Sequence, residues 1–258
     1  MRATTRLRKL FEDGHTIVAP GIADGLSARL VAQAGFEAVY ASGGAISRSA
    51  GIPDLGLLSS TEVVARLESI VDVVELPVIA DADTGYGNAL NARRAARAFE
   101  RAGVAALHLE DQTFPKRCGH YDDKSLVPVA EMVQKLKAAR DALHDPDFVL
   151  IARTDAIAVE GFEAAMDRAA AYVEAGADML FVEAPTTEEQ IAEIARRVPG
   201  WKLINMFQSG KTPLLPTRRL AELGYQLVII PSDLQRVAIA AMRRALRCIA
   251  EDGSTAAM

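Results

Sequence analysis

A pattern of helix, glycine and short apolar run recurs along this chain and constrains its fold more than any other feature. Helical stretches end in Ala-Gly or Leu-Gly at Gly35, Gly103, Gly176 and Gly224, and an apolar run follows each glycine within a few residues. Glycine is the usual residue just after a helix. Runs that are apolar on successive residues are typical of strands buried on both faces of a parallel sheet.

Extended over the whole chain, this pattern predicts eight strands that alternate with eight helices. The predicted strands are 16–21, 38–42, 77–81, 105–110, 148–153, 178–183, 202–206 and 226–230. The predicted helices are 24–34, 60–74, 89–102, 129–143, 162–175, 187–197, 217–223 and 234–250. Strict alternation predicts an α/β protein with the (β/α)8 (TIM) barrel fold, and an open doubly wound sheet is the alternative. Because such a barrel typically takes about 250 residues, we expect one domain over residues 1–258.

Composition and charge exclude several classes of protein. The net charge is −5, and its 29 basic and 34 acidic residues are mixed along the chain, so no basic tract indicates nucleic-acid binding. No apolar run approaches the ~20 residues of a membrane span, and residues 1–13 lack the apolar core of a signal peptide. The two cysteines, Cys118 and Cys248, form no disulfide framework, which indicates a reducing compartment. We therefore expect a cytoplasmic protein that binds neither nucleic acid nor membranes.

Polar residues stand at or just after the carboxyl ends of seven predicted strands. In a (β/α)8 barrel this end carries the active site, so we expect these side chains to meet at one mouth. They are Ser42, Gly43 and Gly44 after the second strand, Asp81 and Asp83 at the third, His108 and Glu110 at the fourth, Arg153 at the fifth, Glu183 at the sixth, Asn205 at the seventh, and Ser232 and Asp233 at the eighth.

Three carboxylates in this set predict a site for a divalent cation. Asp81 and Asp83 are two residues apart and so face the same side of an extended strand, as do His108 and Glu110 on the next strand. Carboxylates at adjacent strand ends repel one another unless a cation neutralises them, and hard oxygen ligands suit Mg²⁺ or Mn²⁺. The alternative is that Asp81 or Asp83 only caps the following helix.

Other residues of the set have a functional and a structural interpretation. Arg153 is suited to bind a carboxylate through two hydrogen bonds, or it forms an internal salt bridge with Glu183 or Asp155. The segment 42–44 offers backbone N–H groups to an anion, or it is a plain turn. Cys248 lies among apolar residues of the last predicted helix, so we expect it to be packed in the core.

The loop Lys116-Arg117-Cys118-Gly119-His120 surrounds one of the cysteines with positive charge. A thiol loses its proton more readily in such surroundings, which predicts a reactive Cys118, and an ordinary surface loop is the alternative. The connection 112–126 is long for a strand-to-helix loop, where 2–6 residues are usual. We therefore expect it to act as a lid that closes over a bound anion.

These motifs resemble those of the isocitrate lyase/phosphoenolpyruvate mutase superfamily over nearly the whole chain. The resemblance rests on residues 42–44, 53–56, 81–87, 108–112, 116–120, 153–155, 183–185 and on Asn205. The Lys-Arg-Cys-Gly-His loop is similar to that of the lyase branch, which includes 2-methylisocitrate lyase and 2,3-dimethylmalate lyase. The segment 207–209 departs from the Asn-Met-x-x-Gly-Gly-Lys-Thr-Pro sequence of some members, which places the difference in the pocket that reads the variable group of the substrate.

The resemblance implies a Mg²⁺-dependent enzyme that cleaves a carbon–carbon bond. The substrate would be a 2-hydroxy di- or tricarboxylate, split by a retro-aldol or retro-Claisen step into a 2-oxo acid and a dicarboxylate. It implies a homo-oligomer, a tetramer in the family, in which the C-terminal helix is exchanged between subunits. Alternatives within the superfamily are a phosphonate mutase or hydrolase and an oxaloacetate hydrolase, and a further alternative is a barrel that only binds a metabolite.

The resemblance also implies roles for individual residues. Asp81 would bind the metal directly, and Asp83 and Glu110 mainly through water. Cys118 would donate a proton to the leaving carbon, and Tyr40, Glu183 or a water on the metal would deprotonate the hydroxyl. The implied catalytic residues are Cys118, Arg153, Glu183, Tyr40 and His108. The implied substrate-binding residues are Ser42, Gly43, Gly44, Asp54, Lys116, Arg117, Gly119, His120, Arg153 and Asn205.

Overall fold

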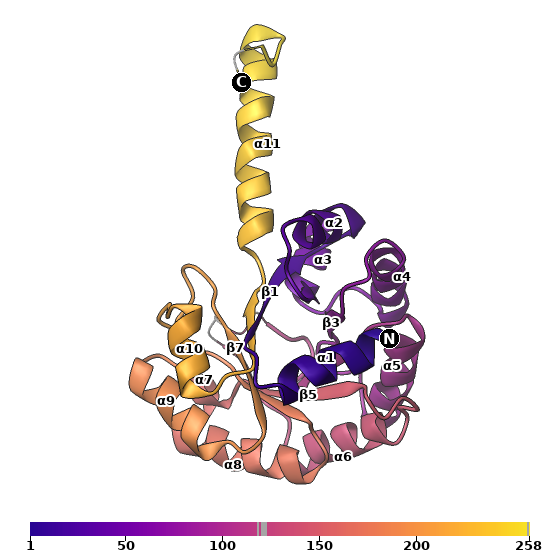
Figure 1. The fold of residues 1–258 in the computed structure, drawn as a ribbon, viewed down its shortest axis with the longest axis vertical. Helices are drawn as coiled ribbons and strands as arrows, with labels where there is room; N and C mark the ends of the chain where they lie inside the picture. Colours follow the sequence, from indigo (N-terminus) through magenta and orange to yellow (C-terminus); the bar gives the residue numbers. More distant parts are fainter. Residues whose placement is uncertain (118, 120–122, 257) are drawn as a thin grey trace.

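The computed structural model describes residues 1–117, 119, 123–256 and 258, and its centre is a closed barrel of eight parallel strands (Figure 1). The strands pair in chain order, and β8 returns to β1. They are β1 (Ile17–Ile22), β2 (Val39–Ala41), β3 (Val78–Asp81), β4 (Ala106–Glu110), β5 (Val149–Thr154), β6 (Met179–Val182), β7 (Trp201–Asn205) and β8 (Leu227–Ile230). The predicted (β/α)8 barrel is confirmed.

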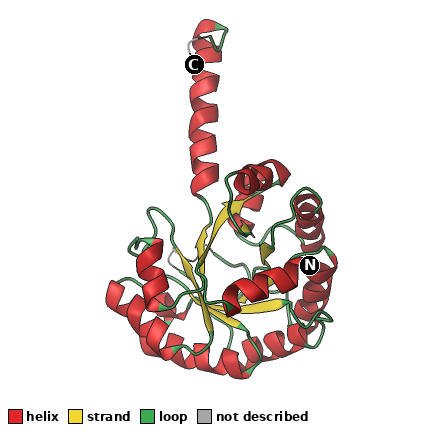
Figure 2. Cartoon of the chain, viewed as in Figure 1, coloured by secondary structure: helices red, strands yellow, loops and turns green. Residues whose placement is uncertain are grey.

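Most of the helices surround the barrel and cover its outer face (Figure 2). The helices of the described chain are α1 (Ala3–Glu12), α2 (Gly25–Gln33), α3 (Gly43–Ser49), α4 (Ser60–Val71), α5 (Ala89–Arg101), α6 (Val129–Arg140), α7 (Ala156–Val159), α8 (Phe162–Glu174), α9 (Glu188–Arg197), α10 (Thr217–Leu223) and α11 (Asp233–Asp252). No helix of the described chain is both long and apolar enough to cross a membrane.

The two-residue period of the strands divides the core into two parts. Alternate strand residues point outward and pack against the helices. The others point into the barrel, where Ile79, Ile151 and Phe181 belong to an inner apolar cluster. The same alternation carried two residues further along β3, β5 and β6 leads to Asp81, Arg153 and Glu183. The polar side chains at the mouth therefore continue the inward face of each strand.

The opposite end of the barrel is closed by α1, which the sequence analysis did not predict. Leu7 and Phe11 of this helix join the inner apolar cluster. The ring of Phe11 packs on that of Trp201 with centroids 5.2 Å apart. Figure 1 shows α1 lying across the barrel. Because this end is sealed by apolar packing, the mouth at the carboxyl ends of the strands remains as the place for a site.

Two short helices at the mouth were also not predicted. The segment 42–44 is neither a plain turn nor a loop, because Ser42 caps α3 by accepting a hydrogen bond from the Ala45 amide at 3.3 Å. Two glycines are poor helix formers, which hid this helix in the sequence. The other short helix, α7, follows Asp155 directly.

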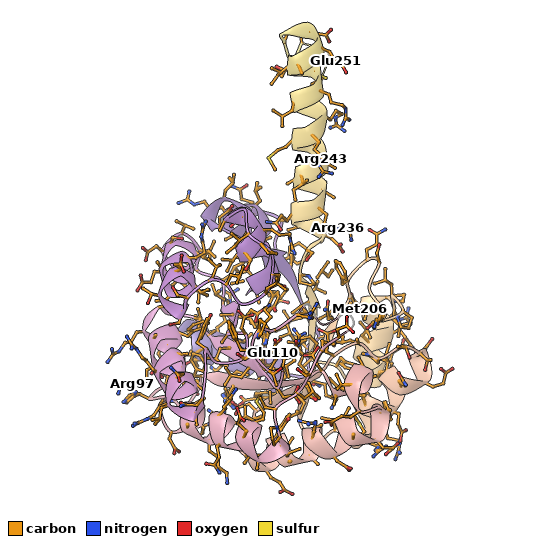
Figure 3. All side chains as sticks on the ribbon, turned by 180° about the vertical axis from the view of Figure 1, so that it is seen from behind. Arg97, Glu110, Met206, Arg236, Arg243 and Glu251 are labelled. Atoms are coloured by element: carbon orange, nitrogen blue, oxygen red, sulfur yellow. The ribbon has the colours of Figure 1, made fainter. Side chains whose placement is uncertain are left out.

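The prediction that Cys248 is packed in the core is wrong. It lies on α11, a helix of 20 residues that contains no buried residue. Figure 1 shows α11 extending away from the barrel, and Figure 3 shows the side chains of Arg243 and Glu251 standing clear of it. The periodicity of the sequence correctly indicated an apolar face, but none of the residues of α11 is buried against the described part of this chain.

Candidate functional site

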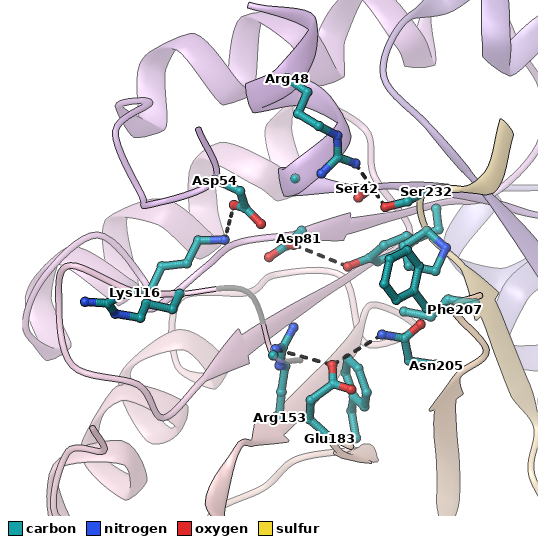
Figure 4. A pocket seen from close by; sticks show the side chains of 17 residues that line it. Ser42, Arg48, Asp54, Asp81, Lys116, Arg153, Glu183, Asn205, Phe207 and Ser232 are labelled. Carbon is teal, nitrogen blue, oxygen red and sulfur yellow. Dashed lines mark hydrogen bonds and ion pairs between the residues drawn. The ribbon is translucent and has the colours of Figure 1, made fainter. Parts of the chain in front are cut away.

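A small cavity lies at the carboxyl ends of the strands and is lined by residues from most of the strand-to-helix connections (Figure 4). Most of the predicted site residues meet there. The lining includes Tyr40, Ser42, Gly44, Arg48, Asp54, Asp81, Lys116, Arg117, Gly119, Arg153, Phe181, Glu183, Asn205, Phe207, Ile229, Pro231 and Ser232.

Tyr40, His108 and Asp81 form a buried hydrogen-bonded group on one side of the cavity. The Tyr40 hydroxyl lies 2.8 Å from Nε2 of His108 and donates to Oδ2 of Asp81 at 3.3 Å. Nε2 of His108 is also 3.5 Å from Oδ1 of Asp81. The rings of Tyr40 and His108 are stacked with an interplanar angle of 14°. Each side chain is therefore fixed in orientation by the other two.

Burial sets the protonation of this group. It lowers the pKa of His108 to about 4, although Asp81 acts in the opposite direction. Burial, and then the charge of Asp81, raise the pKa of Tyr40 well above its ordinary value. At neutral pH the imidazole is uncharged and the phenol keeps its proton. Tyr40 is thus a hydrogen-bond donor in this arrangement, and the geometry does not favour it as a base.

The three predicted metal-binding carboxylates are all inside the mouth, with different surroundings. Burial raises the pKa of Asp81, but His108, Lys116 and Arg153 outweigh it and bring the value to about 2. Burial raises the pKa of Asp83 to about 6, in spite of Lys116. Burial also raises the pKa of Glu110 well above its ordinary value, with Arg153 opposing it. Two of the three carboxylates thus lack sufficient positive charge nearby.

Lys116 lies against these carboxylates. Its Nζ forms ion pairs with Asp54 and with Oδ1 of Asp83, the latter at 2.8 Å. The side chain is 4% exposed. Burial lowers its pKa, but Asp83, Glu110, Asp81 and Asp54 together raise it well above the ordinary value, so the amine stays charged. Lys116 is therefore a cation that reaches the carboxylates from the connection after β4.

The donor set fits a hard divalent cation. Oε1 of Glu110 is buried without a hydrogen-bond partner among the described residues, and burial raises the pKa values of Asp83 and Glu110, so their charged forms would be stabilised by a nearby cation. Within the described chain, no three acidic, histidine or cysteine side chains are grouped closely enough to hold an ion by themselves. This is compatible with Mg²⁺, which usually keeps several waters and takes few protein ligands.

Arg153 occupies another side of the cavity and is surrounded by carboxylates. Its Nε is 2.9 Å from Oδ2 of Asp155 and 3.4 Å from Oε2 of Glu110, and its Nη2 is 3.3 Å from Oε2 of Glu183. The guanidinium lies over the ring of Phe181 at 5.0 Å. The internal salt bridges considered as an alternative are present. Because a guanidinium has five N–H donors, these contacts are compatible with binding a further carboxylate.

A second layer of polar residues holds Asp155 in place. Oδ1 of Asp155 accepts from Lys124 at 2.9 Å, and Asp111 accepts from the Asp155 amide at 3.0 Å and from the Thr154 hydroxyl at 2.7 Å. Asp111 also accepts from the hydroxyl of Tyr172 at 2.8 Å. The orientation of Arg153 is thus set by a hydrogen-bonded network that reaches into the helix layer.

The connection after β4 folds back as a short hairpin over the mouth. Gln112 pairs with Leu126, and the Thr113 amide donates to the Ser125 carbonyl at 2.8 Å. At Gly119 a side chain would collide, because a Cβ there would be 2.4 Å from Nη2 of Arg153 and 2.6 Å from Cγ of Glu183. Glycine at this position thus allows the main chain of the loop to contact the strand-end residues.

Close approach also explains the glycine pair after β2. A Cβ at Gly43 would be 2.8 Å from Oδ2 of Asp81, and one at Gly44 would be 2.8 Å from Oδ2 of Asp54. The Gly43 amide donates to Oδ2 of Asp81 at 3.2 Å. For Gly43, the expectation that this segment offers its N–H groups to a bound anion needs a correction, because this amide is already bonded to a carboxylate of the protein.

Of the remaining predicted residues, some lie at the cavity and others lie outside the described residues. Asn205 donates to Oε2 of Glu183 at 3.4 Å, and Arg117 lines the cavity with an exposed side chain. Cys118 and His120 lie outside the described residues. Phe207, singled out with segment 207–209 as bearing on the substrate pocket, does line the cavity, whereas Arg48 and Lys124 were not predicted as site residues. Arg48 lies on the unpredicted helix α3, whereas a signal for Lys124 was present, since it follows the Lys-Arg-Cys-Gly-His loop by only a few residues.

Comparisons with known proteins agree with this geometry. The sequence model described as phosphoenolpyruvate phosphomutase matches residues 7–250. The chain is 44% identical to 2,3-dimethylmalate lyase of Eubacterium barkeri over 99% of this chain and 89% of that protein. It is 46% identical to 2-methylisocitrate lyase of Aeropyrum pernix over 96% of this chain and 80% of that protein.

A solved structure of similar fold is that of phosphonopyruvate hydrolase in complex with oxalate and Mg²⁺. It superposes with a TM-score of 0.90 at 33% identity and covers 100% of this chain and 90% of the hydrolase chain. The match of the family model over most of the sequence, the barrel and these relatives lead to one assignment. The chain belongs to the phosphoenolpyruvate phosphomutase family.

Proposed function

We propose that this protein is a Mg²⁺-dependent lyase that cleaves the C2–C3 bond of a 2-hydroxy di- or tricarboxylate. The products are a 2-oxo acid and a dicarboxylate. The observation that carries the proposal is the pair of buried cations, Lys116 and Arg153, which face one small cavity together with a cluster of carboxylates. A substrate with several carboxylates can bind the cations, and a divalent cation can balance the carboxylates.

Sequence similarity to two lyases supports the proposed reaction type. 2,3-Dimethylmalate lyase and 2-methylisocitrate lyase are both lyases by name, and each is more than 40% identical to this chain over nearly the full length of this chain. The motif of residues 116–120, on which the resemblance to the lyase branch rests, is at the mouth through Lys116 and Gly119. A phosphonate-processing enzyme would have the same barrel, so the experiment below also tests phosphonopyruvate as a substrate.

The cleavage step transfers two protons and breaks one bond. A base removes the proton of the 2-hydroxyl, the C2–C3 bond breaks as C2 becomes a carbonyl, and its electron pair passes to C3. There the neighbouring carboxylate delocalises it as an enediolate, which then takes a proton at carbon. We assign Glu183 as the base, since burial holds Tyr40 in its protonated form, and Cys118 as the proton donor.

The metal site has Asp81 as its direct ligand in this proposal, with Asp83 and Glu110 acting mainly through water. When bound, Mg²⁺ or Mn²⁺ would lower the pKa of the substrate hydroxyl and stabilise charge on oxygen. Tyr40 and His108 hold Asp81 in a fixed orientation. Residues that are hydrogen-bonded to a metal-binding side chain commonly orient it in this way. Arg153, Lys116, Arg117, His120 and Asn205 orient the carboxylates of the substrate.

A panel of four acids tests the function. Purified protein with Mg²⁺ is incubated separately with 2-methylisocitrate, isocitrate, 2,3-dimethylmalate and oxaloacetate, and the 2-oxo acid or oxalate formed is measured. We expect a 2-oxo acid from at least one of the 2-hydroxy acids, none in EDTA, and recovery when Mg²⁺ or Mn²⁺ is restored.

Phosphonopyruvate is the control for the alternative chemistry. Release of phosphate or formation of phosphoenolpyruvate, together with no product from the 2-hydroxy acids, would replace the lyase by a phosphonate enzyme. Oxalate from oxaloacetate alone would indicate a hydrolase. Undiminished cleavage in EDTA would refute the metal requirement.

A further inference from the structure

Arg48 of α3 lines the same cavity but takes no part in the proposed cleavage step. Figure 4 shows it across the cavity from Arg153, with Asp81 between them. Its Nε donates to Oε1 of Gln235 at 2.7 Å, and its Nη2 donates to Oγ of Ser232 at 2.9 Å. Both partners are uncharged. Among the described residues, no carboxylate forms an ion pair with this guanidinium.

Arg48 is an exposed residue, and the two buried cations of the cavity, Lys116 and Arg153, differ from it by being paired with carboxylates. Lys116 is paired with Asp54 and Asp83. Arg153 is surrounded by Asp155, Glu110 and Glu183. The charge of Arg48 is permanent, because a guanidinium does not lose its proton in proteins. Arg48 thus has no ion pair among the described residues, and the carboxylate nearest to it on the Gly44 side, that of Asp54, is already paired with Lys116.

The side chain of Arg48 is held in position before any ligand arrives. Gln235, which accepts from its Nε, is itself fixed because its Nε2 donates to the Ala45 carbonyl of α3 at 2.9 Å. Nη1 of Arg48 points toward Gly44 and would be 3.2 Å from a Cβ at that position. The two hydrogen bonds use two of the five N–H donors, which leaves the others available to a carboxylate. A side chain fixed in this way loses less conformational entropy on binding.

We infer that Arg48 binds an additional carboxylate of the substrate, so that 2-hydroxytricarboxylates are preferred over 2-hydroxydicarboxylates. The inference rests on the proposed function and deepens it. In this assignment, Arg153 and Lys116 bind the two carboxylates that flank the cleaved bond. A third carboxylate, carried by the far end of the leaving dicarboxylate, then lies against Arg48.

Binding of unreactive acids tests the inference without any need for turnover. Propane-1,2,3-tricarboxylate and succinate are titrated calorimetrically, in the presence of Mg²⁺, into the wild type and into Arg48→Gln and Arg48→Lys. Loss of a charge-assisted hydrogen bond predicts an affinity of Arg48→Gln for the tricarboxylate that is about 10-fold to 100-fold lower. Succinate should change by less than about twofold, and Arg48→Lys should keep part of the tricarboxylate affinity because it keeps the charge.

Gln235→Glu is a matched variant that leaves Arg48 intact. It differs from the wild type by one side-chain group and places a carboxylate against Nε of Arg48, which would neutralise the guanidinium. We expect it to lower tricarboxylate affinity selectively, as Arg48→Gln does. Thermal melting of each variant checks that α3 and α11 remain folded.

The outcomes separate this inference from the proposed function. Equal loss of both ligands in Arg48→Gln and Gln235→Glu, or no loss of either, would overturn the role of Arg48. A selective loss of the tricarboxylate supports it. If the selective loss is found in a protein that cleaves none of the 2-hydroxy acids, the carboxylate-binding role stands and the lyase assignment fails.

Discussion

His108 has no exposed surface, and its imidazole is shared between a phenol and a carboxylate. Its Nδ1 is buried without a hydrogen-bond partner among the described residues. A proton added to this ring would place a positive charge in a buried site. Burial makes that charged form unfavourable and lowers the pKa of His108 to about 4. The residue therefore links the stability of the mouth to pH.

This linkage gives a prediction for the free energy of unfolding. Since the folded pKa is about 4 and that of an unfolded histidine is about 6.5, the unfolded state binds more protons between these values, and stability is lost as the pH falls through this window. At pH 4.5 the loss from His108 is about 2–3 kcal/mol relative to pH 7.5. We expect His108→Gln, measured by urea unfolding in EDTA, to show a pH dependence that is smaller by this amount.

A second histidine provides the control. His144 is 72% exposed, so His144→Gln should leave the pH dependence between 4.5 and 7.5 nearly as in the wild type. Identical slopes for the wild type and His108→Gln would show that the ring is not held neutral by burial.

At the scale of elements, the hairpin after β4 contacts the ends of β5 and β6 through two residues, Gly119 and Lys124. Lys124 is bonded to Asp155 of the barrel and donates to the Gly119 carbonyl of the loop. Gly119 in turn contacts Arg153 and Glu183. The loop is thus packed directly onto residues that the proposed reaction uses, and its main chain forms part of the cavity wall.

Gly119→Ala should separate the loop from the mouth. Its Cβ would overlap the Arg153 guanidinium and the Glu183 side chain, so one of them must move. We expect the kcat/KM of the active substrate to fall by about 10²-fold, the effect of a displacement of about 1 Å at a reacting group, with a melting temperature close to that of the wild type.

Gly25→Ala is the matched control, because a Cβ there contacts a side-chain methyl of Val73 at 3.0 Å, at the start of α2 and away from the cavity. Full activity of Gly119→Ala would contradict the packing of this loop against Arg153.

The sequence predicted the elements better than it predicted their contacts. Each predicted strand matches an observed one to within one residue at either end, because buried parallel strands leave a local signal in successive apolar residues. The carboxylates could likewise be assigned to one mouth from strand ends alone. In contrast, α3 was hidden by Gly43 and Gly44, since propensity there is overruled by close packing against Asp54 and Asp81.

The pairing of charges was not available from the sequence. Nothing local in the chain indicates that Lys116 lies between Asp54 and Asp83, or that Asp155 is shared by Arg153 and Lys124. These contacts depend on how the loops after different strands fold over the barrel. The prediction for Cys248 was wrong for a related reason. An apolar helix face predicts burial, but it does not tell whether the surface that buries it belongs to the same chain.

At the scale of the whole molecule, α11 contacts the barrel at its start, but none of its residues is buried against the described part of the chain. Its exposed apolar side chains include Val237, Met242, Leu246 and Ile249, which are 47–70% exposed. Spacings of three and four residues place Met242, Leu246 and Ile249 on one face of the helix. An apolar helix face of this kind is normally buried, which agrees with the homo-oligomer expected from the resemblance.

The oligomer gives a prediction that can be measured by light scattering after size-exclusion chromatography. We expect the wild type to form a tetramer, and Met242→Glu/Leu246→Glu to shift it to smaller species, because two charges would have to be buried in the contact. Leu30→Glu is the control, since this leucine of α2 is 57% exposed but lies outside α11. A monomeric wild type, or a double variant of unchanged mass, would argue against α11 as the contact.

The hydrogen bonds of Arg48 to Ser232 and Gln235 have a consequence for regulation. These two partners lie at the start of α11, so the direction in which that helix leaves the barrel fixes the guanidinium. If α11 is held by another subunit, assembly and ligand affinity become thermodynamically linked, and each must strengthen the other by the same factor. Dilution of the protein below the dissociation constant of the oligomer would then weaken the preference for tricarboxylates, and a tricarboxylate would in turn drive assembly. Substrate discrimination in this protein would be a property of the assembled state as well as of the barrel.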